Sequence, residues 1–177
     1  HRTLRPSCSL GVTFFPADGS TPNDLMKNAD IALYQAKARG RGRWEFYDPE
    51  LKRRVEKRQA TTDALREALA GDRIGMAVQP QFDFRTRRHL GFEVLARWEE
   101  TDRTVSPAEF IPIAEETGLI IPLGYSVLDQ ALSMACGLRG SGYKAGRIAV
   151  NVAASQLKQP DFVETVAVML DQYGLEP

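Results

Sequence analysis

The sequence contains few of the residues that build disulfides, zinc centres and histidine-dependent catalytic sites. Only Cys8 and Cys136 occur among the 177 residues, far apart and inside apolar patterns, so we expect buried, reduced thiols in a reducing compartment. His1 and His89 are the only histidines, which argues against a zinc site or a histidine-based catalytic pair. Any metal would therefore be held by oxygen ligands, which favours magnesium, manganese or calcium.

An excess of charge of one sign and long apolar runs are also lacking. The 23 basic and 23 acidic side chains cancel, so no overall field favours binding to nucleic acid or to an anionic membrane. No apolar run approaches the roughly 20 residues of a membrane span, and no signal sequence is present. We expect a cytoplasmic protein, whose longer parent can still be anchored to a membrane through a sensor region upstream.

The first part of the chain has the pattern of two short strands around one helix. Residues 7–15 alternate and are rich in strand formers, a helix is expected from Pro22 to Gly40, and residues 44–47 form another short strand. Four cations, spaced two residues apart, gather where the helix ends: Lys37, Arg39, Arg41 and Arg43. From spacing alone, we interpret them as complementing the negative end of the helix dipole.

The same region resembles a known family. Its motifs are residues 9–12 (SLGV), 29–37 (ADIALYQAK) and 40–43 (GRGR). They look like the C-terminal third of a GGDEF (diguanylate cyclase) domain, which implies part of a ferredoxin-like α+β fold. By motif, Lys37 and Arg41 would contact nucleotide phosphates, such as those of GTP, although Gly42 stands where the family usually has Asn. The signature loop of that family should lie upstream of His1.

The next segments predict a helix and a hairpin. Residues 49–70 form a long helical pattern with few apolar anchors, so we expect a connector between domains rather than a core helix. Strand patterns at 74–84 and 90–98 are separated by a short basic turn, which forces an antiparallel pair. With the turn centred near Arg87, Gln79 should lie roughly opposite Leu95.

The second strand of this hairpin has two different faces. Its period of two puts Phe92, Val94, Ala96 and Trp98 on an apolar face that must be packed. The other face carries Glu93, Leu95 and Arg97. Opposite charges in the middle of a strong strand must be paired, hydrated or bound to a ligand, so this face is a candidate site.

Beyond the hairpin, helices and strands alternate. We expect helices over 107–117, 122–138 and 160–173, and a strand over 147–153 with Asn151 on its less bulky side. Such an order suits a barrel that opens to a ligand at one end, where Glu93 and Asn151 would converge. A carboxylate and an amide oxygen suit a hard cation, and Arg97 suits a phosphate. The pattern equally allows a Glu93–Arg97 salt bridge and a structural Asn151.

A second resemblance covers residues 71–177. Its motifs are residues 78–80 (VQP), 91–98 (GFEVLARW), 106–120 (SPAEFIPIAEETGLI) and 150–153 (VNVA). They look like the first part of an EAL domain, the family of cyclic di-GMP phosphodiesterases built on a TIM-like (β/α)8 barrel whose first strand is antiparallel. The resemblance implies that Glu93 and Asn151 are metal ligands, that Gln79 and Arg97 bind substrate, and that Leu95 lines the pocket near the phosphodiester.

These resemblances imply an α/β protein of cyclic di-GMP signalling. The expected parts are residues 1–48 (end of a GGDEF domain), 49–70 (connector helix) and 71–177 (start of an EAL domain). The parent would hydrolyse cyclic di-GMP to linear pGpG with Mg²⁺ or Mn²⁺. The alternatives are an inactive cyclic di-GMP receptor, or a diguanylate cyclase with an accessory EAL domain. We expect the parent to be a homodimer, and residues 1–177 alone to be an inactive fragment that contains no complete catalytic set.

Overall fold

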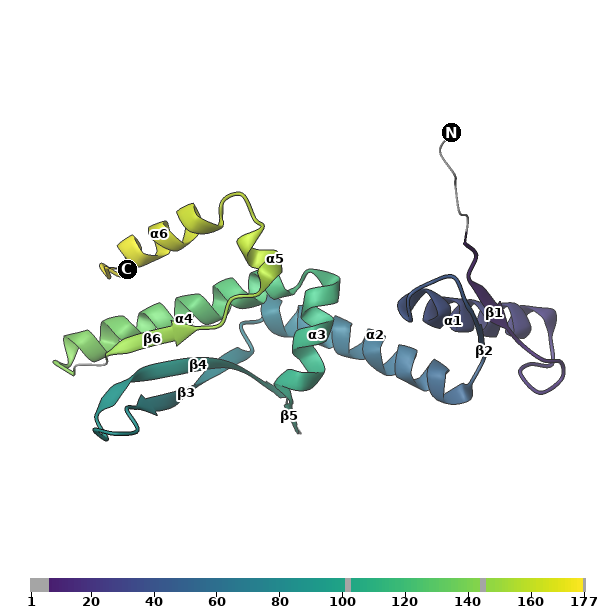
Figure 1. Ribbon diagram of the computed structural model, residues 1–177, viewed down its shortest axis with the longest axis horizontal. Coiled ribbons are helices and arrows are strands. Elements are labelled where there is room, and N and C mark those ends of the chain that lie inside the picture. Colours follow the sequence, from purple (N-terminus) through teal and green to yellow (C-terminus); the bar gives the residue numbers. More distant parts are fainter. Residues whose placement is uncertain (1–6, 101–102, 144–145, 177) are drawn as a thin grey trace. The chain divides into compact units, whose positions relative to one another are not determined.

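The computed structural model describes residues 7–100, 103–143 and 146–176. The chain divides into two compact units, one ending at Ala60 and the other beginning at Thr61. Figure 1 shows the helices and strands of both units. The elements are β1 (Leu10–Val12), α1 (Pro22–Ala38), β2 (Trp44–Phe46), α2 (Pro49–Ala70), β3 (Ile74–Phe82), β4 (His89–Glu100), β5 (Arg103–Val105), α3 (Pro107–Thr117), α4 (Ile120–Gly140), β6 (Arg147–Val150), α5 (Ala154–Leu157) and α6 (Phe162–Gln172).

The first unit packs α1 against the parallel pair of β1 and β2, in the order that the sequence predicts. Thr21 caps α1, because its hydroxyl oxygen accepts a hydrogen bond from the backbone N–H of Asp24 at 3.2 Å. β1 approaches α1 closely. A Cβ on Gly11 would lie 1.9 Å from the carbonyl oxygen of Ala29, so this approach requires glycine.

The last part of α2 belongs to the core of the second unit. Leu65 and Ala68 are fully buried, and Thr61 and Thr62 are buried with them. The sparse apolar pattern predicts a connector rather than a core helix, which is wrong for this part of α2. Small alanine and threonine side chains let this part of α2 pack closely against the core. The prediction considers mainly the large apolar side chains and therefore overlooks them.

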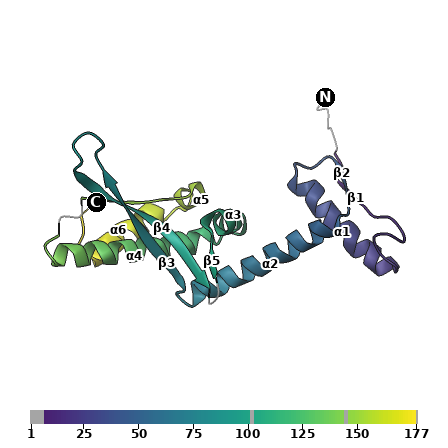
Figure 2. The ribbon, with the colours of Figure 1, turned by 90° about the horizontal axis from the view of Figure 1, so that it is seen from below.

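β4 is the central strand of the sheet in the second unit (Figures 1 and 2). β3 runs antiparallel along one edge of β4. On the other edge, β6 pairs in parallel with residues 91–94 of β4, and β5 pairs antiparallel with residues 98–100. No strand among the described residues pairs with the intervening stretch, 95–97, on that edge. The sheet therefore has a gap beside the middle of β4.

The hairpin register differs from the predicted one. Cross-strand neighbours on the candidate face are Gln79 and Glu93, Ala77 and Leu95, and Gly75 and Arg97. The predicted pairing of Gln79 with Leu95 is wrong by two residues, because the turn lies earlier in the sequence than Arg87. Since side chains alternate with a period of two, a shift of two residues leaves Gln79 on the predicted face.

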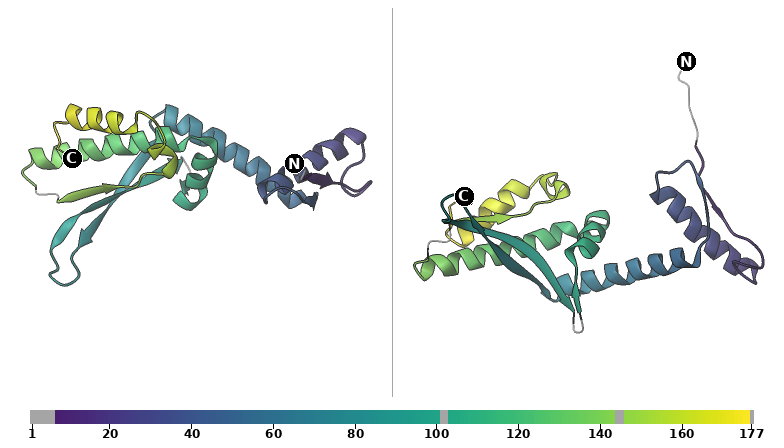
Figure 3. Two further views of the ribbon diagram at one scale, coloured as in Figure 1. Left: turned by 45° about the horizontal axis from the view of Figure 1, so that its top comes forward. Right: turned by 60° about the horizontal axis from the view of Figure 1, so that its bottom comes forward.

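Asp83 fixes the position of this turn. Its carboxylate oxygen Oδ1 accepts hydrogen bonds from the backbone N–H groups of Arg85 at 2.9 Å and Thr86 at 2.6 Å. The hydrogen bonds from Thr86 hold the pKa of Asp83 below its ordinary value of 3.8. The register also shifts between Gln81 and Phe82. The turn projects beyond the helices (Figure 3).

The apolar face of β4 is packed as predicted. Val94 and Trp98 are almost completely buried among residues of α3 and α4. The rings of Trp98 and Phe110 meet edge to face with centroids 5.7 Å apart. Ser106 caps α3 through a hydrogen bond from the backbone N–H of Ala108 to its hydroxyl oxygen. The prediction of alternating faces is therefore confirmed.

Several details near β6 differ from the prediction. The strand ends at Val150 rather than at residue 153, so Asn151 lies immediately after its carboxyl end. Val152, expected on the bulky packed side, is 44% exposed, and Ala153 contacts the core in its place. α5 and β5 are not predicted by the sequence pattern. Cys8 is exposed and Cys136 is half-buried, so neither thiol is fully buried as predicted, and both cysteines are free.

Candidate active site

The candidate site is built around a hydrogen bond between β4 and the residue that follows β6. The side-chain nitrogen Nδ2 of Asn151 donates to Oε1 of Glu93 at 2.8 Å, across 58 positions of the sequence. The parallel pairing of β6 with β4 places Ala149 opposite Glu93, so Asn151, two residues further along, reaches Glu93 diagonally from the same face. The two proposed metal ligands are therefore brought together, at the carboxyl end of β6, where parallel-strand folds carry their functional groups.

The neighbouring positions on β3 leave room beside these groups. Gln79 lies opposite Glu93 and is exposed. The cross-strand neighbours of Leu95 and Arg97 are Ala77 and Gly75. Because Ala77 and Gly75 are small, the side chains of β3 leave space beside Leu95 and Arg97 on this face of the sheet.

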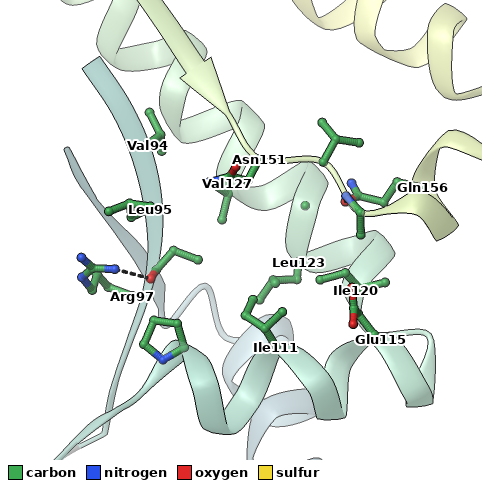
Figure 4. Close-up of a pocket in the computed structure, with 15 residues that line it drawn as sticks. Val94, Leu95, Arg97, Ile111, Glu115, Ile120, Leu123, Val127, Asn151 and Gln156 are labelled. Atoms are coloured by element: carbon green, nitrogen blue, oxygen red, sulfur yellow. Dashed lines mark hydrogen bonds between the residues drawn. The ribbon is translucent and has the colours of Figure 1, made fainter. Parts of the chain in front are cut away.

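Arg97 is half-buried, and its guanidinium is directed to its own strand. Nη1 of Arg97 donates to the carbonyl oxygen of Ala96 at 2.9 Å (Figure 4). Among the residues that the structure describes, no ion pair joins Arg97 to Glu93. The salt-bridge interpretation of these two charges is therefore wrong for this structure. A guanidinium has five N–H donors, so several remain for a ligand.

A cavity of about 350 Å³ lies beside the gap in the sheet. Figure 4 shows Leu95 and Arg97 of β4 on one side of it, Ile111 and Leu123 from the helices on another, and Asn151 on the far side. Three of the predicted site residues thus line one cavity. Gln79 and Glu93 lie next to it and not on its wall.

Two polar residues of this cavity are missed by the sequence analysis. Glu115 of α3 and Gln156 of α5 both line it. Gln156 is the third residue after Ala153, the residue that precedes α5, and this spacing is the half of a capping box in which a glutamine reaches back to the start of a helix. That signal could have revealed the short α5. Glu115 occurs in a helix with several acidic residues, and no pattern distinguishes it.

Glu93 and Asn151 have the chemistry of hard-cation ligands. Because Asn151 donates through Nδ2, its Oδ1 is left as an acceptor, and Glu93 retains Oε2. Such oxygens suit Mg²⁺ or Mn²⁺. The described residues contain no group of three or more His, Cys, Asp or Glu that could hold a metal ion. The pair fits as two ligands of a larger oxygen shell.

The basic cluster in the first unit is exposed. Lys37 lies in the last turn of α1, and Arg41 follows in the left-handed conformation, with φ of 59°. Arg39 pairs with Glu45 at 3.0 Å. Neither Lys37 nor Arg41 has an ion-pair partner among the described residues. Their roles at a nucleotide phosphate stay predictions.

Comparison with protein families identifies both regions. Residues 62–177 match the EAL domain, and residues 1–43 match the family described as diguanylate cyclase, GGDEF domain. The chain therefore belongs to the EAL domain family and carries GGDEF sequence ahead of the EAL region. Both recognised resemblances are confirmed.

Two relatives align with nearly the whole chain. The signaling protein YkoW of Bacillus subtilis is 35% identical over 99% of this chain and 22% of that protein. The bifunctional diguanylate cyclase/cyclic di-GMP phosphodiesterase MucR of Pseudomonas aeruginosa is 34% identical over 98% of this chain and 26% of that protein. The chain thus spans about a quarter of the length of these relatives.

A solved structure supports the fold assignment. The PaMucR phosphodiesterase in complex with c-di-GMP has a TM-score of 0.63 and 33% identity, covering 67% of this chain and 48% of that one. The second unit is therefore the first part of a TIM-like barrel with an antiparallel first strand, as predicted. The first unit is consistent with part of a ferredoxin-like GGDEF domain.

Proposed function

We propose that the full-length protein hydrolyses cyclic di-GMP to linear pGpG in the presence of Mg²⁺ or Mn²⁺. The observation that carries the proposal is the Asn151–Glu93 hydrogen bond at the carboxyl end of β6, beside Leu95 and Arg97, within an EAL fold. Membership of the EAL family and the likeness to a phosphodiesterase solved with c-di-GMP support it.

Each residue has a definite task in this proposal. Arg97 binds a phosphate through the guanidinium donors that its bond to Ala96 leaves available. Gln79, opposite Glu93, offers an amide to the substrate, and Leu95 provides an apolar wall near the phosphodiester. Ala77 and Gly75, the small cross-strand neighbours of Leu95 and Arg97, leave space for the substrate on this face. Together these residues hold the phosphodiester next to Glu93 and Asn151.

Glu93 and Asn151 would hold the divalent cation through their oxygens, together with ligands from outside this pair. When bound, the cation supplies Lewis-acid chemistry, which makes water a better nucleophile and stabilises negative charge on the phosphate. The hydrogen bond between the two side chains fixes their orientation before any cation arrives.

Hydrolysis and binding must be measured separately, because an inactive receptor would bind cyclic di-GMP as well. The full-length protein is incubated with cyclic di-GMP and Mn²⁺ or Mg²⁺, and products are separated by chromatography. Binding is measured calorimetrically with Ca²⁺ in place of these ions. We expect pGpG to form. Binding without any product in either metal would contradict the phosphodiesterase and favour the receptor.

A second proposal concerns the GGDEF region, and the family match over residues 1–43 favours it. Lys37 and Arg41 bind the phosphates of GTP there. Lys37→Ala should weaken GTP binding by the full-length protein by roughly 1.5–3 kcal/mol, the usual strength of a hydrogen bond to a charged group. Arg39→Ala is the matched control, since Arg39 already pairs with Glu45. Equal losses in both variants would indicate a non-specific effect of charge.

A homodimer of the full-length protein and a cytoplasmic location stay predictions. Among the described residues, no helix is long and apolar enough to cross a membrane.

A further inference from the structure

Asn151 needs support from outside its own strand. β6 ends at Val150, and Asn151 is exposed in the three-residue connection that leads to α5. Within the part of the chain that the structure describes, no strand pairing includes residue 151. The hydrogen bond to Glu93 forms only if the backbone of residues 151–153 adopts one particular conformation. A further contact is therefore expected to hold this segment in place.

Gln156 supplies this contact. The residue is only 4% exposed, and its Oε1 accepts a hydrogen bond from the backbone N–H of Ala153 at 3.0 Å. In return, the backbone N–H of Gln156 donates to the carbonyl oxygen of Ala153, also at 3.0 Å. These reciprocal bonds close a tight loop at residue 153, two positions after Asn151. The loop that carries Asn151 is thereby tied to the first turn of α5.

The Gln156 side chain occupies the space beside Gly124 of α4, which has no side chain. A Cβ built on Gly124 would lie 2.0 Å from Nε2 and 2.6 Å from Cδ of Gln156. Such distances are far inside van der Waals contact, so the amide rests directly on the helix backbone. Gly124 is helical, and no positive backbone φ demands glycine there. In a helix interior, glycine is about 1 kcal/mol worse than alanine in general, so its presence here is explained by the space that Gln156 occupies.

We propose that Gly124 and Gln156 are positioning residues for Asn151. Helix α4 fixes the position of the Gln156 amide through the close contact at Gly124. The amide then holds the backbone N–H of Ala153 by a hydrogen bond. This keeps Asn151, two residues earlier, within hydrogen-bond distance of Glu93. Gly124 and Gln156 both line the cavity, but this role requires neither of them to touch the cation or the substrate. The inference rests on the proposed function, because it assumes that Glu93 and Asn151 hold a divalent cation.

The main test compares two glycine-to-alanine changes in one helix. Gly124→Ala places a methyl group against Gln156, whereas Gly137→Ala, also in α4, meets nothing within 4 Å. Both changes favour the helix by the same propensity. Mn²⁺ binding to the full-length protein is titrated by the electron paramagnetic resonance signal of free Mn²⁺, and the binding abolished by Glu93→Gln defines the site.

We expect Gly124→Ala to weaken Mn²⁺ binding at this site by roughly 10- to 100-fold, the usual loss when support for a metal ligand is removed. The kcat for cyclic di-GMP should fall with it, while KM changes little, because Leu95 and Arg97 are untouched. Gly137→Ala should match the wild type in all three quantities. Equal effects of the two changes, or a wild-type Mn²⁺ affinity in Gly124→Ala, would overturn the inference.

Variants of Gln156 keep the test decisive if Gly124→Ala fails to fold. Gln156→Leu preserves volume but removes the acceptor for Ala153 and should weaken Mn²⁺ binding, whereas Gln156→Glu keeps an acceptor oxygen and should restore much of it. Gly124→Ala combined with Gln156→Ala should lose no more than Gln156→Ala alone, because the clash is gone. Additive losses would refute the coupling.

Failure of the proposed function gives a different result. If the wild type binds Mn²⁺ at the Glu93 site but forms no pGpG, phosphodiesterase activity is contradicted, while the Mn²⁺ affinities of the variants still decide the role of Gly124. If the wild type binds no Mn²⁺ that depends on Glu93, the positioning role is overturned together with the metal site.

Discussion

The two faces of β4 differ in burial and in chemistry, although one strand carries both. One face is buried against α3 and α4 through Val94 and Trp98, and its neighbours are large and apolar. The other face carries Glu93 and Arg97, and its cross-strand neighbours include residues as small as Gly75. The first, packed face anchors the strand to the helices, with the cavity at its margin, whereas the second, open face carries the polar groups of the candidate site. A substitution should therefore cost stability on one face and function on the other.

The largest expected effect is on the packed face. Trp98→Ala should lower the free energy of unfolding by about 3–5 kcal/mol, because it removes a fully buried aromatic side chain and leaves a cavity against Phe110. Urea denaturation of the full-length protein, followed by far-ultraviolet circular dichroism, measures the change. Leu95→Ala, on the open face, is the control and should cost clearly less. Equal losses would contradict the division between the faces.

On the open face, Glu93→Gln should lower kcat/KM for cyclic di-GMP by about 100-fold or more, since the cation site loses a charged ligand. Glutamine keeps an oxygen that can accept from Asn151, so the free energy of unfolding should change by no more than about 0.5 kcal/mol, as for ordinary surface substitutions. A steady-state assay and a denaturation curve on the same sample test both parts. Unaltered turnover would remove Glu93 from the site.

Arg97→Ala should weaken cyclic di-GMP binding by roughly 2 kcal/mol, or about 30-fold, if the guanidinium holds a phosphate in a sheltered pocket. An exposed charge that contacts no ligand would contribute about 0–1 kcal/mol instead. Calorimetric titration distinguishes the two values. Arg97→Lys retains the charge but not the planar fork of donors, so it should recover only part of the affinity.

The smallest effect is expected at the hairpin turn, which joins the strands without belonging to either face. Hydrogen bonds from Thr86 lower the pKa of Asp83, so its carboxylate stabilises the folded hairpin above its ordinary pKa of 3.8 and loses this contribution as the pH falls below it. Asp83→Asn should make hairpin stability less dependent on pH between about 5 and 2. Amide hydrogen exchange in β3 measures this, and identical pH profiles would contradict the role of Asp83.

The assignment of faces could be predicted because it depends only on alternation along β4. Register could not be predicted to the residue, since the position of the turn depends on the Asp83 hydrogen bonds and on the irregularity beside Phe82. The error of two residues left every side chain on its predicted face, so the candidate site survived it.

The support of Asn151 is the part of the site that the sequence did not reveal. α5 is only four residues long, too short for a periodic pattern, and the contact of Gln156 with Gly124 joins segments that no local signal relates. The burial of α2 was overlooked for a similar reason, because Ala68 and Thr61 contribute to a core through small size rather than hydrophobicity.

The spacing of Glu93 and Asn151 along the chain has a consequence for the order in which the molecule assembles. β3 and β4 are joined by a short turn, so their pairing closes quickly and at low entropic cost. Asn151 and Glu93 are 58 positions apart in the sequence, with α3 and α4 between them, so we expect their contact to form later. We therefore expect Glu93 to reach its place in the hairpin before Asn151 does. The two proposed metal ligands would then come together only when β6 pairs with β4, as a late step of folding.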